Sequence, residues 1–498
     1  MEIKIEHGNI VDFAADTLIV NLFEGVSTPG GATGAVDKAL DGMISDLIAG
    51  GDFKGKAGEV AVLYPRGAIS ARRVLVVGLG KADSFNLEGV RRASAAAIKR
   101  ARDLNAQHVA TIVHGAGIGG LNVEAASQAT VEGALLSTYR FDAPKKKDPL
   151  NDVASLALVE FDKGRLGAIS KGAKAAEAVA AGVHLARDLV NMPPNIATPT
   201  RLAEAARAIA EAHGLGLTIG DREWAAERKM GAYLAVAQGA GEPPKFIILE
   251  HNGDRTDLPT VVLVGKGITF DTGGISIKPS ERMGDMKSDM GGAAAVLGTM
   301  ETVGRLDLPL RVIAITPCTE NMPDANAYRP ADIITASNGK TIEIISTDAE
   351  GRMVLADALV HAETYKPNAV IDLATLTGAC VVALGGGVAA GIFCNDDALR
   401  DKLLAASEVT HERIWPLPLY DDYRRTINSE VADMKNSGGR MGGVGTSAVF
   451  LREFTNYSWA HLDIAGMAMS EKASDYTPVG GTGFGVRLLT AYLQGMTG

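Results

Sequence analysis

Cysteine is scarce in this sequence, and its scarcity excludes two kinds of site. The chain has three cysteines among 498 residues, Cys318, Cys380 and Cys394, and no two of them form a C-x-x-C pair. Disulfide frameworks and thiolate zinc sites need more cysteines at closer spacing. We therefore expect a chain that works in a reducing compartment.

Long hydrophobic runs and a basic leader are also missing. No stretch approaches the roughly 18 uninterrupted apolar residues of a membrane-spanning helix. Residues 1–13 alternate polar and apolar side chains like a strand, and they lack the basic and then apolar regions of a signal peptide. These absences predict a cytoplasmic protein with no membrane partner.

The sequence has no excess of positive charge. Asp and Glu number 59 against 49 Lys and Arg, which gives a net charge of −10. An acidic chain has no general attraction for nucleic acids or anionic membranes. We expect no nucleic-acid partner, although net charge does not exclude a local basic patch or a secondary DNA-binding role.

Several common catalytic motifs are absent, including H-E-x-x-H and G-x-S-x-G. The segment Gly115-Ala-Gly-Ile-Gly-Gly120 matches the dinucleotide pattern G-x-G-x-x-G, but the acid at the right distance, Glu132, falls within the next predicted helix. We interpret the segment as a glycine turn. His461 lies in a predicted strand, and we interpret it as a hydrogen-bonded sheet residue rather than a metal ligand.

The hydrophobic pattern that is present alternates between strands and helices along the chain, which predicts two α/β domains. We expect a smaller N-terminal α/β domain at 1–165 and an Ala-rich connecting helix at 166–190, which paired prolines end. A larger catalytic α/β domain follows at 191–498, with a mostly parallel central sheet flanked by helices. Its predicted strands include 260–264, 341–345 and 369–373, and its predicted helices include 290–303 and 356–365.

Two segments of the second domain carry charged residues among glycines. In the first, Lys266 follows an apolar strand, Asp271 and Lys278 lie in a glycine-rich loop, and Asp289 precedes an Ala-rich helix. Ligands of such sheets bind beyond the carboxyl ends of the strands. The first segment therefore places charged side chains where a site is expected.

The second segment reads Ser346-Thr-Asp-Ala-Glu-Gly-Arg-Met353. Asp348 and Glu350 are two residues apart, and in an extended chain they would point to one side. Taken alone, each acid of the two segments is better explained as a helix cap or a surface charge than as a ligand, and Asp348 and Glu350 could simply open a helix.

Four carboxylates without a histidine repel one another unless a cation neutralises them. Oxygen ligands suit magnesium and manganese, and zinc also accepts them. The pattern favours a two-metal hydrolase. A phosphoesterase would use a similar cluster, and a binding protein that had kept the fold would be marked by a missing ligand. Without metal we expect Lys266 to form a salt bridge with Asp271.

The second segment is similar to the N-T-D-A-E-G-R-L signature of the leucyl (cytosol) aminopeptidase family, with Ser346 and Met353 as the two departures. Further similar stretches lie at 191–195, 320–323, 328–330 and 372–378. The resemblance covers roughly 175–498, and the N-terminal part resembles the family only in length and α/β character. It implies an aminopeptidase that hydrolyses the N-terminal peptide bond of peptides and prefers leucine-like and other apolar first residues.

The resemblance also implies roles for particular residues. One divalent ion, manganese or zinc, would be held by a neutral lysine and three carboxylates: Lys266, Asp271, Asp289 and Glu350. The second would be held by Asp271, Asp348 and Glu350, with the Asp348 main-chain oxygen as a further candidate. A water between the ions would attack, Lys278 would stabilise the oxyanion, and Arg352 would hold a bicarbonate that acts as base.

The pocket for the first substrate residue and the assembly come from the same resemblance. The family implies that a homohexamer forms and that four residues line the pocket: Met286, Thr375, Gly378 and Ala468. Ordinary core packing is an equally good reading of Met286 and Ala468.

Overall fold

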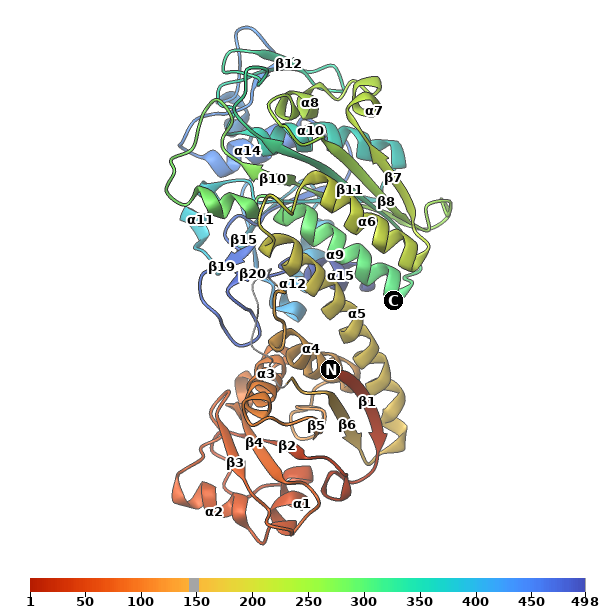
Figure 1. The fold of residues 1–498 in the computed structure, drawn as a ribbon, viewed down its shortest axis with the longest axis vertical. Coiled ribbons are helices and arrows are strands. Elements are labelled where there is room, and N and C mark those ends of the chain that lie inside the picture. Colours follow the sequence, from red (N-terminus) through yellow and green to blue (C-terminus); the bar gives the residue numbers. More distant parts are fainter. Residues whose placement is uncertain (143–151, 498) are drawn as a thin grey trace. The chain divides into compact units, whose positions relative to one another are not determined.

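The computed structural model describes residues 1–142 and 152–497, and these residues form two compact units. The first contains Met1–Ala180 and Lys472–Pro478, and the second contains Ala181–Glu471 and Val479–Gly498. The long helix α5 (Leu166–Asn191) crosses the boundary between them. Each unit has its own hydrophobic core and its own sheet, and Figure 1 shows the two sheets.

The first unit is built on a six-stranded mixed sheet. Runs of Val, Leu and Ile form its central strands, which are buried on both faces, as expected of parallel strands between helices. The strand order is β1 (Glu2–His7), β6 (Ser155–Glu160), β5 (His108–Thr111), β2 (Thr17–Phe23), β4 (Arg73–Gly80) and β3 (Val60–Leu63), with only β3 antiparallel to its neighbour. Its helices are α1 (Gly31–Ala39), α2 (Met43–Gly50), α3 (Leu87–Asp103) and α4 (Val123–Ser137).

The second unit has a nine-stranded mixed sheet with a parallel centre. The strand order is β16 (Ile414–Pro416), β15 (Ala390–Cys394), β18 (Trp459–Asp463), β14 (Ala369–Ala374), β9 (Thr260–Gly265), β11 (Arg311–Asn321), β8 (Lys245–His251) and β7 (Gly216–Gly220), and β10 (Gly267–Asp271) pairs with β11. The strands β18, β14, β9 and β11 run parallel. The mostly parallel sheet predicted from the sequence is therefore confirmed.

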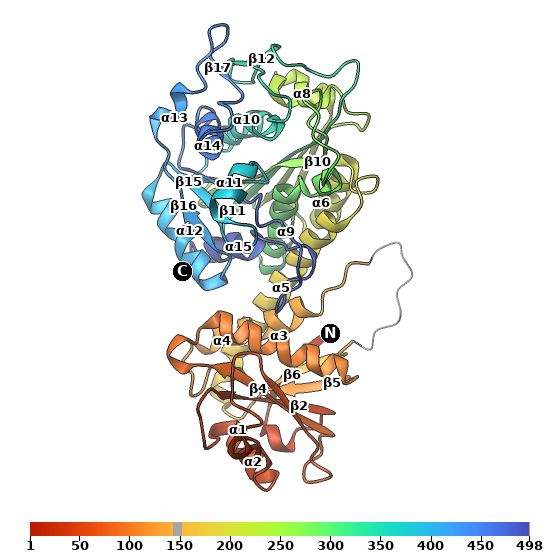
Figure 2. The ribbon, with the colours of Figure 1, turned by 90° about the vertical axis from the view of Figure 1, so that its left-hand side faces the viewer.

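Helices cover both faces of this sheet (Figure 2). One layer contains α6 (Pro199–His213), α9 (Gly291–Leu306), α12 (Asp397–Thr410) and α15 (Val486–Gln494). The other contains α8 (Gly231–Ala237), α10 (Glu350–Ala362) and α14 (Gly443–Arg452). The shorter elements are α7 (Arg222–Glu227), α11 (Gly378–Leu384), α13 (Asp421–Arg425), β12 (Ile333–Thr335), β13 (Thr341–Glu343), β17 (Met434–Lys435), β19 (Met469–Ser470) and β20 (Gly480–Gly481).

The approach of α9 to the sheet depends on glycine at its first turn. A Cβ atom on Gly292 would lie 2.0 Å from the carbonyl oxygen of Leu373 in β14. The amide of Ala293 donates to the carbonyl of Lys266 over 2.8 Å. The start of α9 is thereby fixed against the carboxyl ends of β9 and β14, where the charged residues gather.

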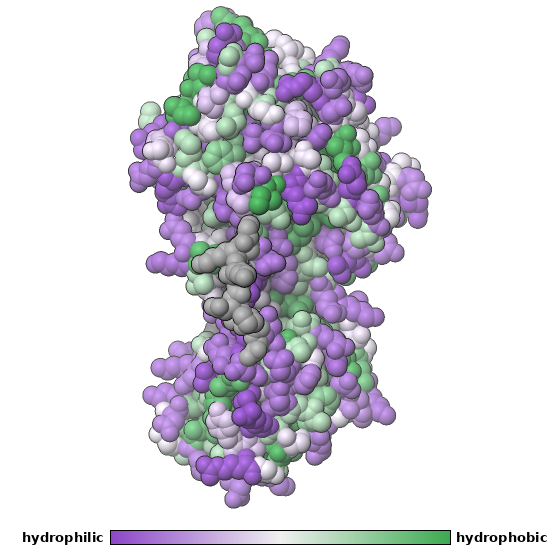
Figure 3. Space-filling model, viewed as in Figure 1, coloured by the Kyte–Doolittle hydropathy of each residue, from purple (hydrophilic) through white to green (hydrophobic). Residues whose placement is uncertain are grey.

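Within residues 1–142 and 152–497, no helix combines the length and hydrophobicity needed to cross a membrane. On the face drawn in Figure 3, hydrophilic residues predominate and hydrophobic ones occur in small scattered groups.

Candidate functional site

Lys266 lies at the centre of the charged cluster. It directly follows β9, and its side chain is almost fully buried. Its Nζ lies 2.7 Å from Asp289 Oδ2 and 2.8 Å from Glu350 Oε1, and it donates to the carbonyl of Thr375 over 3.0 Å. A Cβ on Gly351 would lie 2.5 Å from Lys266 Cε, so a glycine in the first turn of α10 makes room for this lysine.

Lys278 forms the second set of ion pairs. Its Nζ lies 2.8 Å from Asp271 Oδ2 and 2.5 Å from Asp348 Oδ1. The predicted pair between Lys266 and Asp271 is therefore wrong: in the structure the nearer ammonium group to Asp271 is that of Lys278. The loop after β10 folds back, with the Lys278 amide donating to the Thr272 carbonyl over 2.8 Å, and this turn returns Lys278 to the site.

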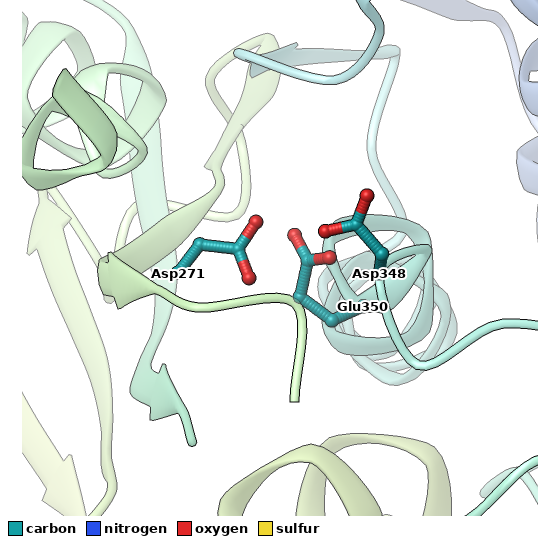
Figure 4. Close-up of side chains that lie close together, drawn as sticks. All are labelled: Asp271, Asp348 and Glu350. Atoms are coloured by element: carbon teal, nitrogen blue, oxygen red, sulfur yellow. The ribbon is translucent and has the colours of Figure 1, made fainter. Parts of the chain in front are cut away.

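Three acids point toward one another at the carboxyl ends of the strands (Figure 4). Asp271, Asp348 and Glu350 each offer a ligand atom, and these atoms lie within 4.8 Å of one another. Of the two conformations considered for residues 348–350, the helix start is the one that the structure shows, because Glu350 is the first residue of α10. The turn before the helix nevertheless brings both side chains to the same place.

Asp289 does not cap the helix that follows it. The N-cap of α9 is Met290, and it makes no side-chain cap bond. Asp289 Oδ1 instead accepts from Lys266 Nζ and from Thr375 Oγ1, each over 2.8 Å. The capping interpretation of this acid is therefore not supported. Asp289 faces the cluster and completes a set of four carboxylates around two lysines.

Burial and mutual repulsion disfavour the charged forms of these acids. Burial is the largest cause that raises the pKa values of Asp271, Asp289 and Asp348, and nearby carboxylates raise them further, while the lysines lower them. Burial lowers the pKa of Lys266, but the surrounding carboxylates outweigh it and raise that pKa overall. The pKa of Lys278 is raised for the same reasons. The cluster is short of positive charge even with both lysines protonated.

Arg352 lies two residues beyond Glu350 in the first turn of α10. Its Nη1 donates to the carbonyl of Asn436 over 2.8 Å, while its buried Nε has no hydrogen-bond partner among the described residues. Burial lowers the pKa of Arg352 to about 10. A buried guanidinium with an unused donor is suited to a small anion.

The four predicted pocket residues lie on segments around the cluster. Thr375 follows β14 and contacts Asp289, and Gly378 begins α11. A Cβ on Gly291 would lie 3.0 Å from Ala468 Cβ and 3.4 Å from Thr375 Cγ2, so these two residues flank the start of α9. Met286 lies half-buried in the short helix Met283–Ser288.

Two asparagines hold the site together, and the motif analysis assigned neither of them a role. Asn321 Nδ2 donates to Asp271 Oδ1 over 2.8 Å and to the Thr347 carbonyl over 3.0 Å. Asn436 accepts from the amide of Ile345 over 2.8 Å as well as from Arg352. Asn321 falls in the stretch 320–323 that carries part of the resemblance, whereas no local pattern marks Asn436.

His461 is a sheet residue, as predicted. It is fully buried in β18, and its Nδ1 lies 2.6 Å from Asp372 Oδ1. The same carboxylate accepts from Trp459 Nε1 over 2.7 Å. This buried network lies across β14 and β18.

Fold and site together define a class of protein. A mostly parallel α/β sheet, with carboxylates and lysines gathered at its strand ends, is the arrangement of a metal-dependent hydrolase. The chain belongs to the cytosol aminopeptidase family: the model of that family's catalytic domain matches residues 184–490, and the model of its N-terminal domain matches residues 19–148. The protein is accordingly a metallopeptidase of the leucyl aminopeptidase type. The N-terminal match extends the likeness beyond residues 175–498, where the motifs lie.

Individual relatives agree with this membership. The chain is 44% identical over 505 residues to a probable cytosol aminopeptidase of Roseiflexus castenholzii, and the alignment covers 100% of both chains. Among solved structures, a tomato leucine aminopeptidase mutant matches with a TM-score of 0.88 at 35% identity, covering 99% of this chain and 96% of that one. The bottromycin maturation enzyme BotP in complex with Mn matches with a TM-score of 0.84 at 36% identity, covering 97% and 100%.

Proposed function

We propose that this aminopeptidase uses two divalent ions, manganese or zinc, to hydrolyse the first peptide bond of peptides with leucine-like or other apolar first residues. The convergence of four carboxylates on two lysines at the strand ends carries this proposal. One ion would be held by Lys266, Asp271, Asp289 and Glu350, and the other by Asp271, Asp348 and Glu350.

The donor set fits divalent ions of this kind. Glu350 Oε2 is buried and has no hydrogen-bond partner among the residues that the structure describes. The raised pKa values of Asp271, Asp289 and Asp348 indicate a site in need of additional positive charge. Bound divalent ions would polarise the peptide carbonyl and make a water molecule more acidic.

Lys266 has to lose a proton before its nitrogen can serve as a ligand. A free lysine has a pKa of about 10.4, and the carboxylates around Lys266 raise its pKa. Metal binding therefore competes with a proton at this nitrogen, so affinity should rise with pH. The burial of Lys266, and its fixed contacts with Asp289 and Glu350, support its role as an oriented ligand.

Lys278 is proposed to donate a hydrogen bond to the carbonyl oxygen as that oxygen gains negative charge. Its side chain is 22% exposed, against 3% for that of Lys266, so Lys278 is the less enclosed of the two lysines. If Asp271 and Asp348 held divalent ions, Lys278 would be free to face the substrate. A donor placed at the developing charge acts mainly on the transition state.

Arg352 is proposed to hold a bicarbonate ion that accepts the proton of the attacking water. The guanidinium itself remains charged and cannot act as the base. Its unused buried Nε and the planar fork of a guanidinium match a planar, bidentate anion.

The segments that carry Met286, Thr375, Gly378 and Ala468 are proposed to form the pocket for the first side chain. Thr375 and Ala468 both lie beside the start of α9. An apolar pocket discriminates weakly between neighbouring sizes, since one methylene contributes only about 1–3 kcal/mol. We therefore expect broad tolerance among apolar first residues.

Separate assays with two classes of substrate test the proposal. Protein stripped by a chelator and refilled with manganese is assayed with a leucine chromogenic amide and, separately, with a chromogenic phosphate ester. We expect amide hydrolysis that depends on the added ion and is lost when the substrate's α-amine is acetylated. Activity on the ester alone would contradict the proposal, because the charged cluster would then serve phosphate chemistry.

We also propose a homohexamer in the cytoplasm. The hexamer is supported by the resemblance of the motifs to a family that forms hexamers. The location is supported by the names of the relatives and by three cysteines that are free in the structure. Light scattering on purified protein should give six chain masses.

A further inference from the structure

A cavity of about 410 Å³ lies in the first unit, where no part of the peptidase chemistry has been placed. Its walls include the ends of β2 and β6 and the residues directly after β5. These three strands are parallel neighbours. After β2 the chain continues to β3 and then β4 on one side of it, and after β5 it continues to β6 on the other side. The cavity therefore occupies the crevice at which strand order reverses, the usual ligand position in an open α/β sheet.

One wall of the cavity is the start of α1. Gly30, Gly31, Ala32 and Thr33 line it. Gly30 provides no side-chain cap, the first turn contains no acidic residue, and among the described residues no protein acceptor is found for the amides of residues 31–33. The free amides and the positive end of the helix favour an anion here.

The opposite wall is the glycine segment Gly115–Gly119. The turn is closed by Leu121 N donating to the Gly115 carbonyl over 3.1 Å. A Cβ on Gly30 would lie 3.5 Å from Ile118 Cδ1, so the glycine segment and the start of α1 approach each other at the cavity. Glycine-rich backbone from two segments thus borders one opening, and such backbone is typical of phosphate sites.

The rest of the wall is apolar and partly uncovered. Phe23, Val26 and Ile112 line the cavity, and Ile118 and Phe161 at its edge are 80% and 77% exposed. Apolar side chains so exposed beside a cavity offer a surface for a flat ring. Glu160 at the end of β6 and Arg165 add one acid and one base to the lining.

We propose that this cavity binds a nucleoside diphosphate, with the diphosphate at the two rows of amides and the base against the apolar wall. The acid that could accept from the ribose is Glu160. Glu132, at the sequence position of the dinucleotide fingerprint, is instead buried in α4, with Oε2 2.6 Å from Arg91 Nε. The glycine motif is therefore a turn, as predicted, and the turn borders a ligand site.

Calorimetric titration of the full chain with ADP tests the proposal. The chain is stripped of divalent ions beforehand, so that phosphate cannot bind a metal in the other unit. We expect ADP to bind with a Kd below 1 mM, and adenosine or pyrophosphate alone to bind at least about tenfold more weakly. Absence of ADP binding, or equal binding of adenosine, would overturn the proposal.

Two variants and a control locate the site. Gly117 has no atom within 4 Å of an added Cβ, so Gly117→Glu should fold and place a carboxylate at the amides. Arg165, with its side chain 41% exposed, can be replaced as Arg165→Ala without disturbing the core. We expect both variants to weaken ADP binding at least about tenfold. The control is Gly167→Glu in α5, which is exposed and equally free of neighbours and should bind ADP as the unmodified chain does. Unchanged binding in both Gly117→Glu and Arg165→Ala would overturn the assignment.

Discussion

Glu350 links the two halves of the charged cluster. Its carboxylate contacts Lys266, and its ligand atom lies within 4.8 Å of those of Asp271 and Asp348. Glu350→Gln keeps the size and removes the charge. We expect amidase turnover to fall by at least about 100-fold, as when a metal site loses part of its shell, and the bound metal per chain to fall in parallel.

Metal analysis and steady-state kinetics measure these two effects. Glu363→Gln is the matched control, because Glu363 is exposed at the other end of the same helix. Turnover of Glu350→Gln equal to that of the control would show that the acid holds no catalytic ion.

Lys278 is a second test at the scale of one residue. If it donates to the developing oxyanion, Lys278→Met should lower kcat by about 100- to 1,000-fold and change KM little, because the interaction forms mainly in the transition state. Lys402→Met, at an exposed position of α12, is the control. An increase in KM at unchanged kcat would assign Lys278 to substrate binding instead.

At the scale of elements, the position of α9 depends on its contact with β14. Because a Cβ on Gly292 would lie 2.0 Å from a backbone oxygen, Gly292→Ala must shift the helix or the strand. We expect the free energy of unfolding to fall by about 1–3 kcal/mol or more. Urea unfolding followed by tryptophan fluorescence reports on this unit, since Trp224, Trp415 and Trp459 all lie within it. Gly284→Ala, in open space, should leave stability unchanged.

His114, three residues after β5, makes the free energy of unfolding of the first unit depend on pH. Burial lowers the pKa of His114 to about 4, against an ordinary value near 6.5. The neutral ring is favoured in the folded state, so its contribution is complete above about pH 6.5 and is lost as the pH falls toward 4. When the pH falls from 7 to 5, this histidine should lower the free energy of unfolding of the first unit by about 2 kcal/mol.

Hydrogen exchange of peptides from β5, read by mass spectrometry, measures this loss in the first unit. His114→Gln cannot titrate and should lose less protection between the two pH values. Equal losses in both proteins would mean that the ring is already charged, or not buried, in the folded state.

Much of the element pattern could be predicted from hydrophobic periodicity. The strands expected at 260–264 and 369–373 correspond to β9 and β14, and the helix expected at 290–303 corresponds to α9. The helix expected at 356–365 begins earlier in the structure, at Glu350. The prediction missed its first turn because Glu350, Gly351 and Arg352 do not form an apolar helix face. In the structure Glu350, at the start of this helix, contacts Lys266, and helix propensity takes no account of such tertiary contacts.

The sequence singled out the charged residues that cluster in the structure, but not the ion pairs that they form. Their positions at predicted strand ends and among glycines singled out six charged residues, and these six lie close together in the structure. Which lysine faces which acid depends on the fold of residues 272–278 back toward the cluster, a long-range feature with no local signal. Asn436 is similar, because 84 positions separate it from its hydrogen-bond partner Arg352. The limits 1–165 and 191–498 of the domains remain predictions.

At the scale of the whole molecule, removal of metal should separate activity from folding. Lys266 and Lys278 form ion pairs with acids of the cluster and so neutralise part of its negative charge. We expect chelation to abolish amidase activity, to leave the circular dichroism spectrum unchanged, and to be reversed by manganese or zinc. A full rate in stripped protein would contradict a metal-dependent reaction, and a loss of helical signal would show that the ions hold the fold.

The ion pairs that Lys266 and Lys278 form with the acids have a consequence for when the enzyme becomes active. If the cluster binds ions as proposed, a chain that folds with its lysines paired to the acids would stay inactive until it took up those ions. Uptake of the proposed ions would require Lys266 to give up a proton and Lys278 to leave its ion pairs with Asp271 and Asp348. Output of the enzyme would follow the supply of the ion, and a store of finished but silent molecules could respond to that supply without new protein synthesis.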